Sequence, residues 1–330
     1  MAAVGVTAKG VDQKDIEEAR AFNTQLESLI VTVPTIMAIG APESRRLRRE
    51  GKGIFPKPVF LEEASTIEVQ GRSGPIPVRV IRPAGKAMGV YIHIHGGGWA
   101  LGAHDMQDVA LKTLADETGL VAASIGYRLA PEHPYPAAHD DCEEAVLQLL
   151  KNGERLLDAP LKFAIGGESA GAHLSVATLL RLRDRHGVRN AIAAANLVYG
   201  AYDMNGTPSQ VLWGDRNLVL SWPIIDWFRN TFTPGMNVVQ RRDADISPLY
   251  ARLDGMPPAL FTVGTMDPLI DDTLFMTERW RIAGNEAEIA IYPEGVHGFN
   301  QYPTALARKA NANQYEFLRR SLTWRAPSFT

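Results

Sequence analysis

The pattern Gly167-x-Ser169-x-Gly171 restricts the fold of this chain more than any other stretch of its sequence. The residues before it, 163–168, form a short apolar run that predicts a buried strand, and residues 173–180 carry apolar side chains at the spacing of a helix. Glycine leaves room for a sharp turn between strand and helix and tolerates strained backbone angles. The pattern is therefore typical of a nucleophile elbow, in which a serine is exposed at a strand-to-helix turn.

The pattern alone also fits an ordinary tight turn, so the hypothesis that Ser169 is catalytic depends on its partners. A catalytic serine requires a base that takes its proton and an acid that orients the base. After such an elbow the acid precedes the histidine in the chain. His297 follows the apolar run 288–292 and lies far enough beyond the elbow to fold back onto it. An exposed loop histidine is the alternative, and we predict that His297 is the base.

Asp267 is the acid that we predict, because it shortly follows the apolar run 259–264 and so lies at the carboxyl end of a strand. Asp271 and Asp272 are close rivals. Both fall at the start of the next helix, where a carboxylate caps the helix or complements its dipole. The candidate catalytic residues are therefore Ser169, Asp267 and His297.

Three consecutive glycines, Gly96 to Gly98, stand between His95 and Trp99 at the end of another apolar run. Such a loop presents backbone N–H groups without obstruction by side chains, as an oxyanion hole opposite the elbow requires. A phosphate cradle is the alternative, but the spacing lacks both G-x-G-x-x-G and the lysine of a P-loop. His93-x-His95 on one strand face would suit a metal ion, but no matching third ligand stands out in the sequence.

Apolar runs that predict strands alternate with helical patterns along most of the chain. Alternation of this kind indicates βαβ units and a mainly parallel sheet, so we predict an α/β fold. The first two strands are expected to form a hairpin. The predicted strands are residues 65–70, 76–83, 89–95, 121–127, 163–168, 191–199, 260–264 and 288–292, and the predicted helices of the core include residues 137–152, 273–282 and 304–322.

Two segments lack strands and interrupt this alternation. The leading segment predicts helices at about residues 11–29 and 43–50, and residues 201–248 contain many large apolar side chains. We predict that the two segments pack together as a helical cap over the active end of the sheet. The predicted organisation is an N-terminal helical cap segment (1–50), the first part of the core (51–200), a cap insertion (201–248) and the second part of the core (249–330).

Composition and charge exclude several classes of function. The net charge is −3 and the sequence pI is about 6.3, so there is no basic field for nucleic acid or anionic lipid. The one basic run, residues 45–49, is flanked by glutamates, and we interpret it as a solvated helix face. Cys142 is the only cysteine, which excludes an intrachain disulfide. We find no apolar stretch long enough for a membrane span and no secretory signal, and we expect a cytoplasmic protein.

Taken together, the motifs resemble those of the hormone-sensitive-lipase-like branch of the α/β-hydrolase superfamily, the bacterial family IV esterases. The segments that carry the resemblance are, in chain order, residues 95–99, 127–137, 167–171, 267–269 and 297–299. Glu168 and Ala172 depart from the aspartate and glycine that are more frequent at the elbow in this family. The resemblance implies an α/β-hydrolase fold, a mainly parallel central sheet flanked by helices, with a helical cap.

The resemblance also implies the roles of the site residues. Ser169 would be the nucleophile, His297 the base and then the acid, and Asp267 the residue that orients His297. The family hydrolyses carboxylic esters with short to medium acyl chains and uses neither a metal nor a cofactor. The oxyanion hole would be formed by the backbone N–H groups of Gly97, Gly98 and Ala170.

Two other functions stay open at this point. The same triad serves an amidase or a deacetylase, because acyl-enzyme chemistry cleaves amides as well as esters. A non-catalytic receptor for a small ligand is the other alternative, but receptors of this fold have lost the histidine that is present here as His297. We also predict a homodimer in which the exposed edge strand 288–292 pairs across a two-fold axis.

Overall fold

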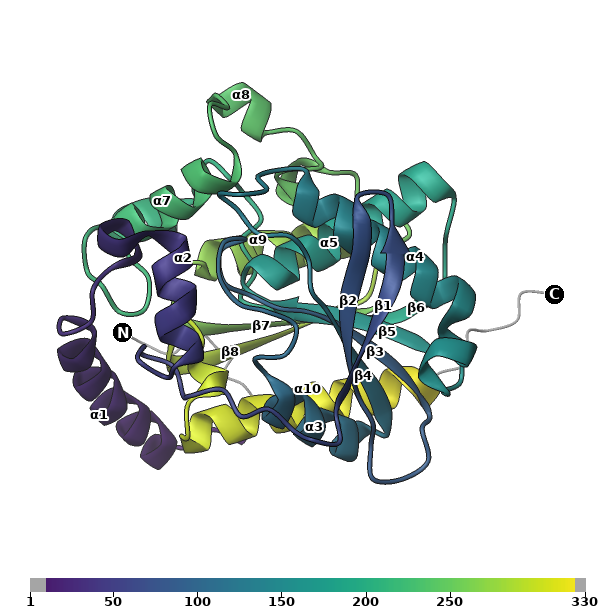
Figure 1. Ribbon diagram of the computed structural model, residues 1–330. Coiled ribbons are helices and arrows are strands. Elements are labelled where there is room, and N and C mark those ends of the chain that lie inside the picture. Colours follow the sequence, from purple (N-terminus) through teal and green to yellow (C-terminus); the bar gives the residue numbers. More distant parts are fainter. Residues whose placement is uncertain (1–9, 324–330) are drawn as a thin grey trace.

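The computed structural model describes residues 10–323, and its centre is an eight-stranded sheet (Figure 1). The strand order is β1-β2-β4-β3-β5-β6-β7-β8. β2 pairs antiparallel with β1 and with β4, and all other neighbours are parallel. The strands are β1 (Ser65–Gly71), β2 (Gly74–Ile81), β3 (Gly89–Ile94), β4 (Leu120–Ile125), β5 (Phe163–Glu168), β6 (Ile192–Val198), β7 (Ala259–Met266) and β8 (Ala287–Val296).

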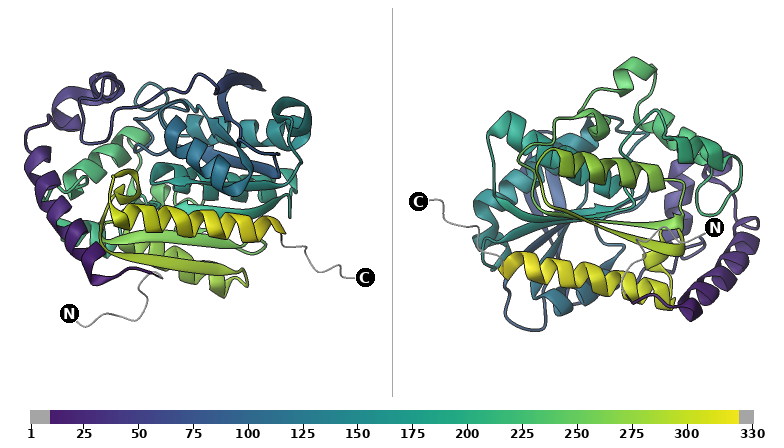
Figure 2. Two further views of the ribbon diagram at one scale, coloured as in Figure 1. Left: turned by 90° about the horizontal axis from the view of Figure 1, so that it is seen from below. Right: turned by 180° about the vertical axis from the view of Figure 1, so that it is seen from behind.

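Helices cover both faces of the sheet, which gives three layers (Figure 2). One face carries α4 (Ala137–Leu157), α5 (Ala170–His186) and α9 (Ile270–Ile282), and the other carries α3 (Asp108–Thr118) and α10 (Ala305–Thr323). An apolar cluster fills each of the two interfaces. The inner strands β3, β4 and β5 are buried along their whole length, as expected of parallel strands covered on both sides. The predicted α/β class with a mainly parallel sheet is confirmed.

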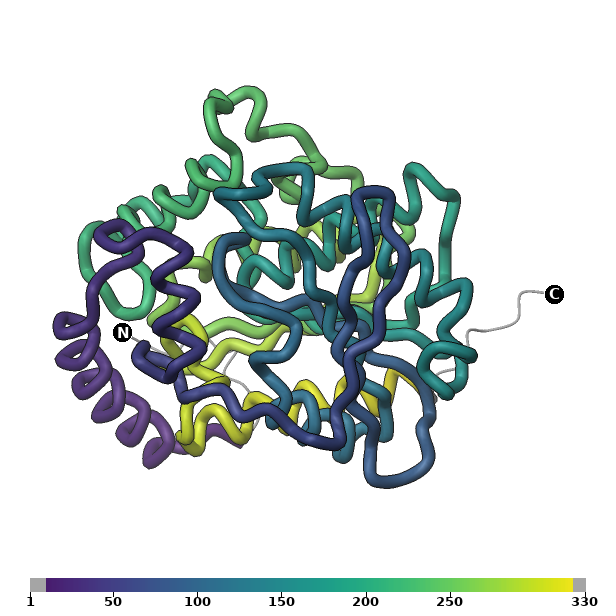
Figure 3. Tube along the Cα trace, viewed as in Figure 1, coloured from purple at the N-terminus to yellow at the C-terminus, as the bar shows by residue number. Residues whose placement is uncertain are grey.

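Most of the remaining helices lie toward the carboxyl ends of the parallel strands. There Figure 3 shows the purple tube of residues 36–49 beside the green tube of residues 222–232. α1 packs against β8 and α10, and α2 contacts α7. Among residues 10–323, no helix has both the length and the apolar character that crossing a membrane requires. The helices of this region are α1 (Gln13–Ile30), α2 (Ile36–Arg49), α6 (Pro208–Trp213), α7 (Trp222–Phe232) and α8 (Val238–Arg241).

Two helices differ from the sequence-based expectation. α3 was not among the predicted helices, although its buried residues Leu111, Leu114 and Ala115 have helical spacing. α2 begins at Ile36 rather than near residue 43, because the Thr35 side chain caps it and the chain then bends within the helix at Gly40. The predicted edge strand is present as β8, and the homodimer through it stays a prediction.

The interpretation of residues 45–49 as a solvated face is wrong for two of its arginines. Arg45 donates hydrogen bonds to Glu132 and to two backbone carbonyls of the core. Arg48 points inward and lines a pocket. Arg46 fits the interpretation, because it is exposed and pairs with the flanking glutamates. The sequence alone does not indicate which side of this helix faces the core.

A partly buried ion pair connects residues 201–248 to the core. Asp245 accepts hydrogen bonds from Arg181 of α5 at 2.5 and 2.6 Å and from the Tyr135 hydroxyl at 2.7 Å. Burial opposes the charge on Asp245, but the hydrogen bonds from Arg181 outweigh it and hold the pKa of Asp245 well below its ordinary value. The carboxylate therefore stabilises the folded state, because folding favours its charged form.

We expect Asp245→Asn to lower the free energy of unfolding by about 2 kcal/mol at neutral pH, since it leaves Arg181 with one anionic partner fewer. The lowered pKa fixes the sign of the pH dependence. The stabilisation is fully present above the ordinary carboxyl pKa and is lost as the pH falls through the lower pKa of the folded state. Urea unfolding from pH 7 to pH 3 measures this, with Asp215→Asn at an exposed position of the same segment as the control. An equal effect of both substitutions would contradict the assignment.

Candidate active site

Ser169 occupies the turn between β5 and α5 with φ 57° and ψ −120°, a strained conformation for a residue that is not glycine. The turn is tight because the chain passes close to β3. A Cβ atom on Gly167 or Gly171 would lie about 2 Å from the carbonyl oxygen of Ile94, which only glycine avoids. The backbone N–H of Ser169 donates to the carbonyl of Val198 at 2.9 Å and fixes the turn against β6. The predicted strand, turn and helix are all present.

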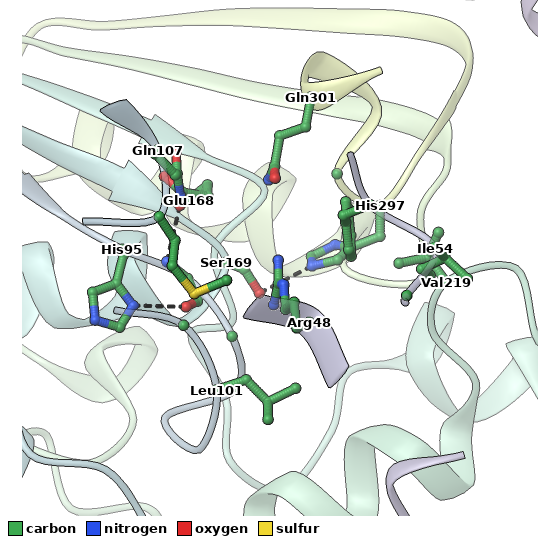
Figure 4. Close-up of a pocket in the computed structure, with 18 of the residues that line it drawn as sticks. Arg48, Ile54, His95, Leu101, Gln107, Glu168, Ser169, Val219, His297 and Gln301 are labelled. Carbon is green, nitrogen blue, oxygen red and sulfur yellow. Dashed lines mark hydrogen bonds between the residues drawn. The ribbon is translucent and has the colours of Figure 1, made fainter. Parts of the chain in front are cut away.

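His297 and Asp267 meet Ser169 at this edge of the sheet, each one residue beyond the end of a strand. His297 Nε2 lies 2.9 Å from Ser169 Oγ, and His297 Nδ1 lies 2.8 Å from Asp267 Oδ2. A carboxylate can only accept, so Nδ1 carries the proton that it donates to Asp267, and Nε2 is free to accept the proton of Ser169. The three residues form one continuous chain of hydrogen bonds, as Figure 4 shows for Ser169 and His297.

Asp267 is 1% exposed, and its second oxygen accepts a hydrogen bond from the backbone N–H of Leu269 at 2.9 Å. That bond holds the carboxylate in the orientation that His297 needs. Asp271 and Asp272, the rival acids, point elsewhere. Both lie in the first turn of α9 and bind residues of the segment 202–210, and burial raises the pKa of Asp272 to about 6.

The loop after β3 places Gly97 and Gly98 opposite the Ser169 turn, at the pocket that all three residues line. Among the described residues, neither glycine N–H donates to a protein acceptor, and Ala170 is the first residue of α5, whose N–H has no acceptor within the helix. Gly97 has φ 119°, and a Cβ there would lie 2.3 Å from the carbonyl oxygen of Leu101. Among the described residues, these three N–H groups therefore have no protein acceptor, and their joint role as an oxyanion hole stays a prediction.

Glu168 ties the glycine loop to the elbow strand. Its carboxylate accepts hydrogen bonds from the Gly96 N–H at 2.9 Å and from Gln107, and it lies 3.0 Å from His93 Nε2. Burial opposes its charge, but His93 and these donors hold the pKa of Glu168 below its ordinary value. His93 in turn contacts Ser124. Glu168 and His93 therefore support the loop.

A second contact that supports the glycine loop was not predicted from the sequence. The indole N–H of Trp99, at the end of the glycine loop, donates to His173 Nδ1 at 3.0 Å, and His173 Nε2 lies 2.9 Å from the carbonyl of Ile246. Burial lowers the pKa of His173 to about 4, so its ring is neutral and Nδ1 accepts. His173 lies four residues after Ser169 in the elbow helix, but nothing in the sequence indicates which neighbours its ring contacts.

A cavity of about 610 Å³ adjoins Ser169 and His297, which is a size typical of sites for small organic molecules. Its wall combines the core with the two helical segments at this edge. Figure 4 shows Leu101, Ile54 and Val219 among the side chains that surround the serine. The apolar lining also includes Ile36 of α2 and Ile224 and Phe228 of α7.

Comparisons with known proteins agree with this geometry. The alpha/beta hydrolase fold family matches residues 91–301. The carboxylic ester hydrolase LipN of Mycobacterium tuberculosis is 33% identical over 74% of this chain and 66% of its own length, slightly under two thirds. The carboxylesterase NlhH of the same species is 31% identical over 87% of this chain and 91% of its own length. A hyperthermophilic esterase from the archaeon Pyrobaculum calidifontis superimposes with a TM-score of 0.82 at 26% identity, over 91% of this chain and 97% of that structure.

The chain therefore belongs to the alpha/beta hydrolase fold family, and the resemblance drawn from its motifs is confirmed. The match spans the glycine loop, the elbow and the strands β7 and β8, which end one residue before Asp267 and His297.

Proposed function

We propose that this carboxylic ester hydrolase cleaves short- to medium-chain esters through a Ser169–His297–Asp267 triad and an acyl-enzyme intermediate. The observation that carries the proposal is the continuous hydrogen-bond chain from Asp267 through His297 to Ser169 at the wall of an apolar cavity. Relatives named for ester hydrolysis support the reaction class.

In the first step, Ser169 Oγ attacks the carbonyl carbon of the ester while His297 Nε2 takes the hydroxyl proton. Asp267 stabilises the imidazolium that forms. When the tetrahedral intermediate collapses, His297 gives the proton to the leaving alcohol oxygen, and the acyl group stays on Ser169. Water, with His297 again as the base, then attacks the acyl carbon and releases the acid.

We propose that the N–H groups of Gly97, Gly98 and Ala170 stabilise the negative oxygen of each tetrahedral intermediate. Donors fixed in advance stabilise this charge most, because they need no reorganisation when it appears. We further propose that residues 1–50 and 201–248 act as a cap that sets the length of acyl chain the site accepts. The support is that α2 and α7 supply part of the apolar wall.

The test is hydrolysis of p-nitrophenyl esters from acetate to laurate by the purified protein. The proposal predicts that kcat/KM is highest for short or medium acyl chains and falls for laurate. Absence of hydrolysis at every chain length would contradict it. Matched ester and anilide substrates distinguish an esterase from an amidase.

Gly97→Ala is expected to lower kcat about a hundredfold or more, since a Cβ against the Leu101 carbonyl moves the loop and its N–H donors. Gly85→Ala is the control, because a Cβ at Gly85 meets no atom within 4 Å. The measurement is kcat on p-nitrophenyl butyrate, with a thermal melt of each variant. A variant of Gly97 with unchanged kcat would refute the assignment of the oxyanion hole.

A further inference from the structure

One cation in the pocket has no function in the chemistry described above. Arg48 extends from α2 among the side chains that line the cavity, and Figure 4 shows it in the same space as Ser169 and His297. Its three neighbouring arginines in α2 all pair with acids: Arg45 with Glu132, Arg46 with Glu43 and Glu50, and Arg49 with Asp105. Within residues 10–323, no hydrogen bond joins the Arg48 guanidinium to a protein acceptor.

The contact that Arg48 does make leaves its donors free. Its guanidinium carbon lies 4.6 Å from the centre of the Phe55 ring, and Phe55 stacks on Tyr302 with ring centres 5.5 Å apart. A guanidinium that lies over a ring is held by its flat side, while its N–H groups point outward in the plane. The aromatic pair therefore orients Arg48 without satisfying its hydrogen bonds.

The acidic side chains that line the pocket, Glu168 and Asp203, form hydrogen bonds with groups other than Arg48. Glu168 is occupied by His93, Gln107 and the Gly96 N–H. Asp203 accepts from the Tyr250 hydroxyl and from the Asn205 N–H. The other lining cations differ from Arg48, because Arg229 pairs with Asp226 and the two lysines, Lys52 and Lys57, are exposed.

Burial lowers the pKa of Arg48 below its ordinary value, but an arginine stays charged in a protein. Arg48 is partly buried, so its guanidinium has lost part of its hydration without gaining a hydrogen-bonded partner. A ligand that supplies the opposite charge compensates such a loss. The planar fork of one guanidinium matches one carboxylate in geometry and in charge.

We propose that Arg48 binds a carboxylate of the substrate, so that the preferred substrates are esters that carry a free carboxylate on the acyl or the alcohol side. The inference rests on the proposed ester hydrolysis and adds the substrate class. Arg48 acts as a specificity-determining residue, and the chemistry at Ser169 is the same for charged and neutral esters.

The experiment compares charged esters with neutral esters of the same shape, by titration of the released acid. On the acyl side, monoethyl glutarate is paired with ethyl 5-methylhexanoate. On the alcohol side, 4-acetoxybutanoate is paired with 4-methylpentyl acetate. The monoethyl esters of succinate, adipate and suberate extend the first arm, so that spacing to the carboxylate is sampled. The readout is the ratio of kcat/KM for the charged ester to that for its neutral partner.

For wild type, we expect the ratio to exceed one in at least one arm. In Arg48→Gln we expect it to fall about tenfold, chiefly through KM, because only the charged substrate loses a bonded partner. Arg48→Lys keeps the charge but not the fork, and an intermediate ratio is expected. Arg46→Gln is the matched control: it removes the same charge from an exposed position of the same helix and is expected to leave the ratio unchanged.

The ratio is internal to each variant, so a loss of folded protein does not change it. A fall of less than threefold in Arg48→Gln, or an equal fall in Arg46→Gln, would overturn the inference. Wild type provides a test without any variant: salt is expected to raise KM for the charged ester and not for its neutral partner. Hydrolysis of neutral esters with no preference for charged ones in either arm refutes the Arg48 inference alone. Failure to hydrolyse any ester refutes the proposed function.

Discussion

Ser169→Ala is expected to lower kcat for p-nitrophenyl butyrate by roughly 10⁴- to 10⁶-fold, because no other group can form the acyl-enzyme. His297 and Asp267 have no nucleophile to activate once the hydroxyl is gone. Substrate binding should survive, since the cavity wall is unchanged. The measurement is the steady-state rate at saturating ester, with the melting temperature as the check on folding.

Ser175→Ala is the matched control for this prediction. Ser175 lies on the same helix, α5, and donates its hydroxyl to the Gly171 carbonyl at 2.8 Å, away from the cavity. We expect its kcat to stay within about threefold of wild type, as for a substitution outside the reacting groups. Retention of wild-type activity by Ser169→Ala would show that the hydrolysis occurs elsewhere on the molecule.

Asp267→Asn is expected to lower kcat on the order of 10⁴-fold with little change in geometry. An asparagine amide donates to His297 Nδ1, where the carboxylate accepts from it. The proton of the ring then moves to Nε2, which can no longer take the proton of Ser169. The prediction therefore concerns the tautomer of His297 rather than its position.

Asp271→Asn is the matched control, because it removes the same charge from a nearby position. Asp271 lies on the same loop-to-helix connection and contacts Ser209 instead of His297. We expect kcat of this variant to stay close to wild type. The measurement is kcat of both variants from pH 6 to pH 9, which shows which of the two aspartates orients His297. A loss of kcat in Asp271→Asn as large as that in Asp267→Asn would show that Asp267 is not the acid of the triad.

The sequence predicts the three catalytic candidates because each lies where a parallel strand ends. The carboxyl ends of parallel strands meet at one edge of the sheet, so Ser169 after β5, Asp267 after β7 and His297 after β8 are brought together by topology alone. Glycines at tight contacts, such as Gly167 against Ile94, also show in the sequence, since no other residue fits.

The sequence does not predict the features that depend on how separate segments pack. Arg45 and Arg48 are three residues apart in one basic run, yet one binds Glu132 and the other lines the pocket. Which arginine faces which neighbour is decided by the kink at Gly40 and by the contact between α2 and α7. The Trp99–His173 hydrogen bond likewise joins residues 74 positions apart.

The most direct test of the account is covalent labelling with a fluorophosphonate, which reacts with an activated serine and mimics the tetrahedral intermediate. Mass spectrometry of the intact protein is predicted to show one adduct per chain, and the digested protein is predicted to carry it on Ser169. Loss of esterase activity should follow the extent of labelling. Complete inactivation with the adduct on another residue, or full activity after stoichiometric labelling of Ser169, would contradict the claim that Ser169 is the nucleophile.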